Sequence, residues 1–146
     1  MDRVRQGVPV VRWEARGPAD GPTARQLRHR VDDWIADELR VDDVRRSDMV
    51  LTVAEALANS AEHAYDNCSG TGEMRVAILL DDADARVVIE ISDHGTWTDR
   101  AQAPTNTSRG RGLLLMRALA DDVTLDAGPD GTSIQLHFHG APGRRA

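Results

Sequence analysis

The alternation of apolar and polar positions predicts several strands, each with one buried face. Five segments have this pattern: residues 8–15, 74–80, 87–91, 123–127 and 132–138. In the first of them, Val11, Trp13 and Ala15 would share a face. The last two are separated by Gly128-Pro129-Asp130-Gly131, a sequence typical of the turn of a β-hairpin.

In three other segments, apolar residues recur with the period of an α-helix. In the first, Thr23 and Gln26 form a plausible capping box. The apolar stripe of this helix would then be Leu27, Val31, Trp34, Ile35 and Leu39. A second helix is predicted from about residue 44 or 47 to residue 65, and a third over residues 113–120. Residues 94–110 have no periodicity, and a loop of this length is more often a lid or binding loop than an idle connection.

This order of elements predicts an α/β two-layer sandwich. A mixed, mainly antiparallel sheet would carry about three helices on one face. A chain of 146 residues is long enough for one domain with its own core. We expect a single domain over residues 1–146, with its core at about 8–139 and residues 140–146 as a disordered tail.

The second predicted helix carries the most informative chemistry. Glu55, Asn59 and His63 are four residues apart and therefore share one helix face. The opposite face, expected to belong to the core, carries Val50, Val53, Ala54, Leu57, Ala58, Ala61 and Ala64. A carboxylate beside an amide could hold a hydrated Mg²⁺ and position a nucleophile. Taken alone, the segment is better explained as an amphipathic helix with a solvated polar face.

Two later segments strengthen the functional interpretation. Asp93-His94-Gly95 ends a predicted strand, although an Asp before Gly is also common in turns. Further on, Arg109-Gly110-Arg111-Gly112 opens the third helix. Glycines at a helix start leave backbone N–H groups accessible and let phosphates approach closely.

In this order, the three segments resemble the N, G1 and G2 boxes of the GHKL (Bergerat-fold) ATP-binding superfamily. Glu-x-x-x-Asn-x-x-x-His-Ala-Tyr, starting at Glu55, is similar to the motif of bacterial anti-sigma-factor serine/threonine kinases. The stretch from Gly131 to Leu136 fits the short G3 element, so the resemblance covers roughly residues 8–139. It implies the Bergerat ATP-binding fold, in agreement with the predicted sandwich.

The resemblance implies roles for the residues of the first motif. Asn59 would be the Mg²⁺ ligand, and Glu55 would orient or deprotonate an attacking hydroxyl. His63 would contact the nucleotide or the lid, or would close the end of the site.

The other motifs imply contacts with the nucleotide. Asp93 can accept the exocyclic N–H of adenine, Gly95 would let the backbone pass close to the base, and Thr132 would complete the contact. Arg111 is the natural charge partner for phosphates, and a surface arginine is the less favoured alternative. The residues expected around the β- and γ-phosphates are Gly110, Arg111, Gly112, Leu113 and Leu114, the last two through helix N-terminal amides. At Trp97 the family often has glycine, which puts the turnover rate in question more than nucleotide binding.

The amino-acid composition argues against several other classes of protein. The net charge of −6 and the scarcity of aromatic residues argue against direct nucleic-acid binding. The chain has no lysine, which excludes a Walker A loop and the eukaryotic-type protein-kinase fold. No apolar run is long enough to span a membrane, and no signal peptide is visible. A single cysteine, Cys68, fits a reducing compartment, so we expect a cytoplasmic protein.

We therefore predict a protein serine/threonine kinase that uses ATP and Mg²⁺. By resemblance, it would phosphorylate an anti-sigma-factor antagonist and sequester a sigma factor, and the family commonly forms homodimers. One alternative is a regulatory module that binds ATP without phosphoryl transfer; an intact Glu55 favours the kinase and Trp97 the module. Another is an ATP-binding domain excised from a larger multidomain signalling protein.

Overall fold

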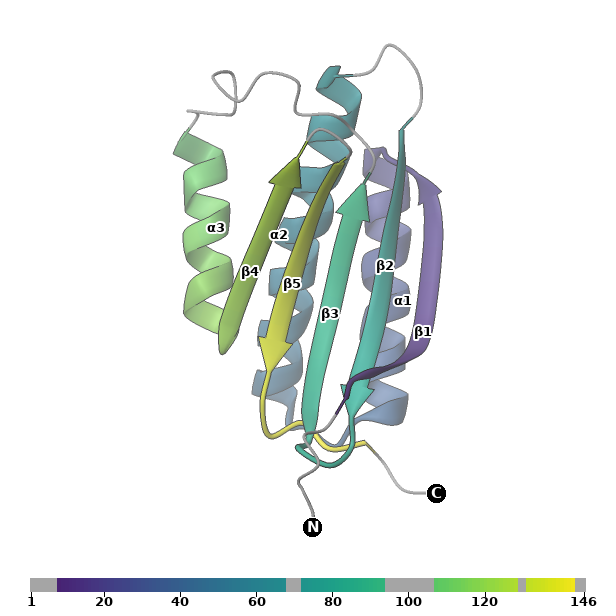
Figure 1. Ribbon diagram of the computed structural model, residues 1–146, viewed down its shortest axis with the longest axis vertical. Coiled ribbons are helices and arrows are strands. Elements are labelled where there is room, and N and C mark those ends of the chain that lie inside the picture. Colours follow the sequence, from purple (N-terminus) through teal and green to yellow (C-terminus); the bar gives the residue numbers. More distant parts are fainter. Residues whose placement is uncertain (1–7, 68–71, 94–106, 129–130, 144–146) are drawn as a thin grey trace.

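The computed structural model describes residues 8–67, 72–93, 107–128 and 131–143 (Figure 1). The elements of this part of the chain, in order, are β1 (Val10–Pro18), α1 (Gly21–Glu38), α2 (Asp43–Asn67), β2 (Glu73–Asp81), β3 (Arg86–Asp93), α3 (Thr107–Leu119), β4 (Asp122–Gly128) and β5 (Gly131–Phe138). None of the described helices is long and apolar enough to cross a membrane.

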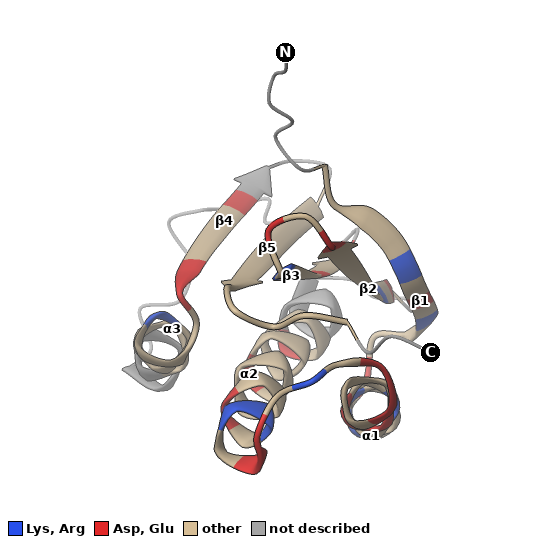
Figure 2. Ribbon diagram, turned by 90° about the horizontal axis from the view of Figure 1, so that it is seen from below, with Lys and Arg blue, Asp and Glu red and all other residues tan. Residues whose placement is uncertain are grey.

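The strands form one open sheet in the order β1-β2-β3-β5-β4. All four pairings between the described strands are antiparallel, so the sheet is more regular than the mixed one predicted. Seen end-on, the three helices lie on one face of the sheet (Figure 2). Helix α2 lies between α1 and α3, and none of the described helices lies over the opposite face of the sheet. The predicted α/β two-layer sandwich is confirmed.

The core lies between the sheet and the helices. Alternate residues of the central strands point into it and are fully buried, among them Met74, Val76, Ile78, Val87, Ile89, Ile91, Leu136 and Phe138. Helix α1 contributes the predicted stripe, of which Leu27, Val31 and Ile35 are at most 2% exposed. The periodicity of the sequence therefore identified the buried faces of these elements correctly.

Two local predictions in the N-terminal part were wrong. The N-cap of α1 is Asp20, whose carboxylate accepts the Thr23 N–H at 2.8 Å, so Thr23 lies inside the helix rather than capping it. In β1 the register shifts between Val11 and Trp13, because Arg12 is an additional residue opposite β2. Val11 consequently does not share the face of Trp13 and Ala15, and it is 47% exposed.

The buried side of α2 is also rotated from the one expected. Met49, Val53, Ala56 and Leu57 are fully buried, whereas Ala58, which was assigned to the core face, is exposed. Alanine fits a core and a helix surface equally well, so the sequence pattern could not distinguish the two. The core-facing side of α2 lies between the polar positions and this alanine-rich side.

The chain end also differs from its prediction. Residues 140–143 were expected to be a disordered tail, but they are bonded to two other connections of the fold. The Arg40 N–H donates to the Pro142 carbonyl at 2.9 Å, and the Ala141 N–H donates to the Ala85 carbonyl at 2.8 Å. Ala141 is fully buried. The prediction is therefore wrong for these residues, while 144–146 lie outside the described part.

Candidate functional site

The polar face of α2 meets α3 at Gly112. A Cβ atom placed on Gly112 would lie 2.9 Å from Glu55 Oε1 and 3.9 Å from Asn59 Nδ2. The glycine therefore allows α3 to approach both side chains, and two motifs more than 50 residues apart in sequence meet at one place. Glu55 and Asn59 are both partly exposed.

The second part of the site lies at the end of the sheet. Asp93 is the last residue of β3, Thr132 is the second residue of β5, and the two are direct partners in the antiparallel register. They are only 4% and 6% exposed, and both point to the helix side of the sheet, as the buried positions of their strands do. This end of the sheet lies at the same end of the molecule as the last turns of α2 and the start of α3 (Figure 1).

Thr132 has a buried hydroxyl group. Its Oγ1 has no hydrogen bond to any group in the described part of the chain. Buried polar atoms are nearly always hydrogen-bonded, so an atom of this kind needs a specific explanation. A ligand seated beside Asp93 would supply the missing donor or acceptor.

The start of α3 differs from the predicted one. The helix begins at Thr107, six residues earlier than expected, so the glycines lie inside its first turns. The first four N–H groups of a helix are the ones without intrahelical partners, and here they belong to residues 107–110. The amides of Leu113 and Leu114 consequently lie within the helix rather than at its start, and the Leu114 side chain is 67% exposed.

Several predicted site residues cannot be placed with the others. His63 lies in α2 one turn after Asn59, but its side chain is outside the described part of the chain, as is that of Arg111. Gly95, Trp97 and most of the expected lid also lie outside it. The site that can be described consists of Glu55, Asn59, Asp93, Gly112 and Thr132.

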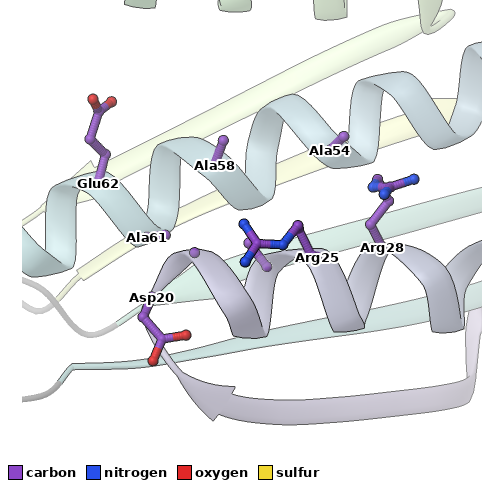
Figure 3. A pocket seen from close by; sticks show the side chains of 9 residues that line it. Asp20, Arg25, Arg28, Ala54, Ala58, Ala61 and Glu62 are labelled. Carbon is purple, nitrogen blue, oxygen red and sulfur yellow. The ribbon is translucent and has the colours of Figure 1, made fainter.

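A second surface lies on the other side of α2 (Figure 3), and the sequence motifs did not predict it. A cavity of about 540 Å³ lies between α1 and α2, and Arg25 and Arg28 line it. The only signal in the sequence was the spacing of two arginines three residues apart on one helix.

Comparison with known proteins gives a consistent result. A family model described as the histidine kinase-like ATPase domain matches residues 17–138. The chain is 32% identical over 97 residues to the anti-sigma F factor of Bacillus licheniformis and 33% identical over 98 residues to that of Bacillus subtilis. Each match covers 60% of this chain and 64% of the relative, so the chain spans just under two thirds of the length of these relatives.

A solved structure shares the fold. The crystal structure of the RsbU and RsbW domains of a Mycobacterium tuberculosis protein superimposes with a TM-score of 0.65 and 23% sequence identity. The superposition covers 92% of this chain and 34% of the other. At this identity the match is evidence for the fold alone.

Proposed function

The chain belongs to the histidine kinase-like ATPase family, and from this we propose that it is an ATP-dependent serine/threonine kinase of the anti-sigma type. The single observation that carries the proposal is the approach of Gly112 to Glu55 and Asn59. A carboxylate and an amide are thereby held together where the glycine-bearing helix passes α2. A solvated polar helix face would not require such a close contact.

Asp93 and Thr132 would bind the adenine. The carboxylate of Asp93 can accept the exocyclic N–H of adenine, a group that guanine does not present at the same place. The buried Thr132 hydroxyl would pair with the base directly or through a water molecule. Because an incorrect base would leave buried groups unpaired, ATP should bind much more tightly than GTP.

Asn59 would hold Mg²⁺, and the donor set fits this ion. The amide oxygen of Asn59 is a hard donor, which suits a cation that keeps several waters and takes few protein ligands. When bound, the ion would neutralise phosphate charge. We further propose that residues 110–114 lie along the phosphates; contacts by the amides of Leu113 and Leu114 would require the first turns of α3 to open.

In the proposed reaction, Glu55 accepts the proton of a serine or threonine hydroxyl on the partner protein. The hydroxyl oxygen forms a bond to the γ-phosphorus, and the bond between that phosphorus and the bridging oxygen of ADP breaks. Glu55 thus acts on the hydroxyl, while Asn59 acts on the nucleotide. This division of roles makes the two residues separable by mutation.

The relatives suggest the biological context. The similarity to anti-sigma F factors supports a sigma factor as the protein that is sequestered. We propose an anti-sigma-factor antagonist as the protein that is phosphorylated, and a homodimer as the assembly.

The test compares nucleotide affinity with phosphate transfer in two variants. Glu55→Gln should leave ATP affinity within about twofold and abolish radiolabelled transfer to the antagonist, because only the proton acceptor is lost. Asn59→Ala should weaken both, because a Mg²⁺ ligand is lost in ground and transition states alike. Circular dichroism would control for folding. A wild-type protein that binds ATP and the antagonist but transfers no phosphate would contradict the kinase proposal.

A further inference from the structure

A cavity of about 480 Å³ lies at the end of the molecule opposite the candidate site. The segments that meet there are the start of β1, the last turn of α1, the end of β2 with the turn that follows it, and residues 140–143 (Figure 1). We call it the α1-end cavity. Its volume lies within the range of about 300–1,000 Å³ that is usual for small-molecule sites.

One wall of the α1-end cavity is apolar. It consists of the half-buried ring of Trp34 and the side chain of Leu80, which is 5% exposed. Gly143 lies against Leu80, since a Cβ atom on this glycine would be 3.0 Å from Leu80 Cδ2 and 3.5 Å from Asp82 Oδ1. A side chain at position 143 would press against this wall, so the glycine keeps this part of the cavity open.

A guanidinium group from β1 also lines the cavity. Arg12 is the additional residue of the β1 bulge, and bulges commonly redirect a side chain next to a functional site. Its Nη2 donates to Asp82 Oδ2 at 2.7 Å. The two side chains are 43% and 62% exposed, and exposed ion pairs are weak. Because a guanidinium group has five N–H donors, Arg12 can donate to a second acceptor at low cost.

Carboxylates line the cavity beside this arginine. Glu38, the last residue of α1, forms no ion pair with any arginine in the described part of the chain. Asp82 uses Oδ2 for Arg12, and its Oδ1 lies beside Gly143. The last turn of α1 has no basic residue, and the C-terminal end of a helix favours a positive group. This side of the cavity therefore suits an ammonium group, whereas Arg12 suits a carboxylate.

The presence of both charges restricts the class of ligand. Two carboxylates beside one arginine would repel a polyphosphate, and a ligand with positive charge alone would lie beside Arg12. A metal ion fits poorly, because the described residues contain no group of three His, Cys, Asp or Glu side chains placed to hold one. A small zwitterion with an apolar body matches both charges and the wall of Trp34 and Leu80.

We propose that the α1-end cavity binds a free α-amino acid with an apolar side chain. Its ammonium group donates to Glu38 and Asp82, and its carboxylate accepts from Arg12. Its side chain packs against Trp34 and Leu80. Because the ligand binds only the folded chain, it also stabilises the fold. The proposal does not rest on the proposed kinase function, since the cavity lies at the other end of the molecule.

The test compares amino acids with analogues that lack one charge. L-leucine and L-phenylalanine are titrated into ¹⁵N-labelled protein, in parallel with N-acetyl-L-leucine, which has no ammonium group, and L-leucinamide, which has no carboxylate. The two amino acids should give saturable shifts of the amide resonances of residues 34–39, 80–83 and 140–143. Each analogue should bind about tenfold or more weakly than leucine, because one charged hydrogen bond is lost.

Two variants assign the charges to their side chains. Glu38→Gln should weaken the binding of leucine about tenfold but not that of N-acetyl-leucine, which has no ammonium group to lose. Arg12→Gln should weaken the binding of leucine by a similar factor but not that of leucinamide. The matched controls are Asp37→Asn and Arg16→Gln, which are exposed on the same two elements without lining the cavity and should bind leucine normally.

Several outcomes would overturn the proposal. Leucinamide that binds as tightly as leucine would indicate a site for cations, and N-acetyl-leucine that does so would indicate a site for anions. No saturable shifts at millimolar concentrations, shifts confined to other regions, or unchanged leucine affinity in both variants would also contradict it. Circular dichroism would control for folding. None of these results bears on ATP binding or transfer, so the two proposals fail separately.

Discussion

Gly112 is the residue of α3 that lies against the Glu55 side chain of α2. The space that its Cβ would occupy is closed by the carboxylate of Glu55, at 2.9 Å, rather than by backbone. The end of a flexible side chain can move at low cost, so the position of Glu55, and not the stability of the fold, depends on this glycine.

We predict that Gly112→Ala separates stability from transfer. Because alanine favours a helix more than glycine does, the free energy of unfolding should stay unchanged or rise by up to about 1 kcal/mol. Phosphate transfer should fall roughly tenfold or more, because the carboxylate is displaced. Gly21→Ala is the matched control, since its Cβ would meet only Arg25 Nη1 at 3.7 Å. Unchanged transfer in Gly112→Ala would argue against Glu55 as the proton acceptor.

Thr132 makes the second prediction at this scale. Thr132→Val removes a buried hydroxyl without a partner in the described chain, so the free energy of unfolding should stay constant or rise. ATP affinity measured by calorimetry should fall by about 1 kcal/mol, the usual worth of one hydrogen bond. Ser133→Ala, on the opposite face of β5, is the control. A variant that loses stability but keeps its ATP affinity would exclude Thr132 from the site.

Among the elements, an arginine connects the start of α2 to the ends of α3 and β5. Arg45 Nη2 donates to Asp121 Oδ2 at 2.7 Å and to the His139 carbonyl at 2.8 Å, and the His139 N–H donates to the same carboxylate oxygen at 2.7 Å. Partial burial of Asp121 would by itself raise its pKa, but the hydrogen bonds from His139 and Arg45 outweigh this, so the pKa is lowered.

The connection predicts a pH dependence of stability. A carboxyl group whose pKa is lowered by folding stabilises the protein above its unfolded pKa of about 3.9, and this contribution is lost as the pH falls through the folded pKa. Asp121→Asn should cost about 1 kcal/mol near pH 7, a modest value because the side chain is 38% exposed. The difference from wild type should shrink below about pH 4 in urea titrations. The exposed Asp126→Asn on β4 should show no such difference.

The sequence predicted these elements well where one periodic signal dominates. In β2 every second residue is apolar and buried, so burial could be inferred directly. The bulge at Arg12 could not be inferred. One additional residue leaves the alternation of apolar and polar residues intact, but it reverses the face of the sheet on which the residues before it lie. The glycines near residue 110 favour a helix start but are tolerated inside one, which explains the misplaced start of α3.

The candidate site was predicted in its residue types but not in its arrangement. Glu55 and Asn59 share a face through helix geometry alone, whereas Asp93 and Thr132 become partners only because β5 pairs with β3. That pairing is a property of the sheet order, which no local pattern contains. The cavity between α1 and α2 was missed for a related reason, because alanines that face another helix and alanines that face the core have the same spacing.

At the scale of the whole molecule, the last described residues close the end opposite the candidate site. Residues 140–143 run between the connection from α1 to α2 and the turn from β2 to β3, and Leu39 and Gly143 form an isolated β-bridge. Two connections far apart in sequence are thereby joined by one short segment.

We therefore predict that this segment is required for full stability. A chain shortened to end at His139 loses the two backbone hydrogen bonds and the burial of Ala141, and its free energy of unfolding should fall by about 2 kcal/mol. A chain that ends at Gly143 keeps these contacts and is the control. Equal denaturation midpoints for the two chains would show that the segment contributes nothing.

The open sheet has a consequence for self-association at high protein concentration. Strands β1 and β4 each pair with one described neighbour, so each presents a row of backbone groups that another strand could join. The bulge at Arg12 distorts one edge, and the exposed Asp122 and Asp126 place negative charge along the other. These features oppose the growth of fibrils by edge-to-edge addition of strands. Replacing both aspartates with threonine would remove the charge from one edge and lower the concentration at which such growth begins.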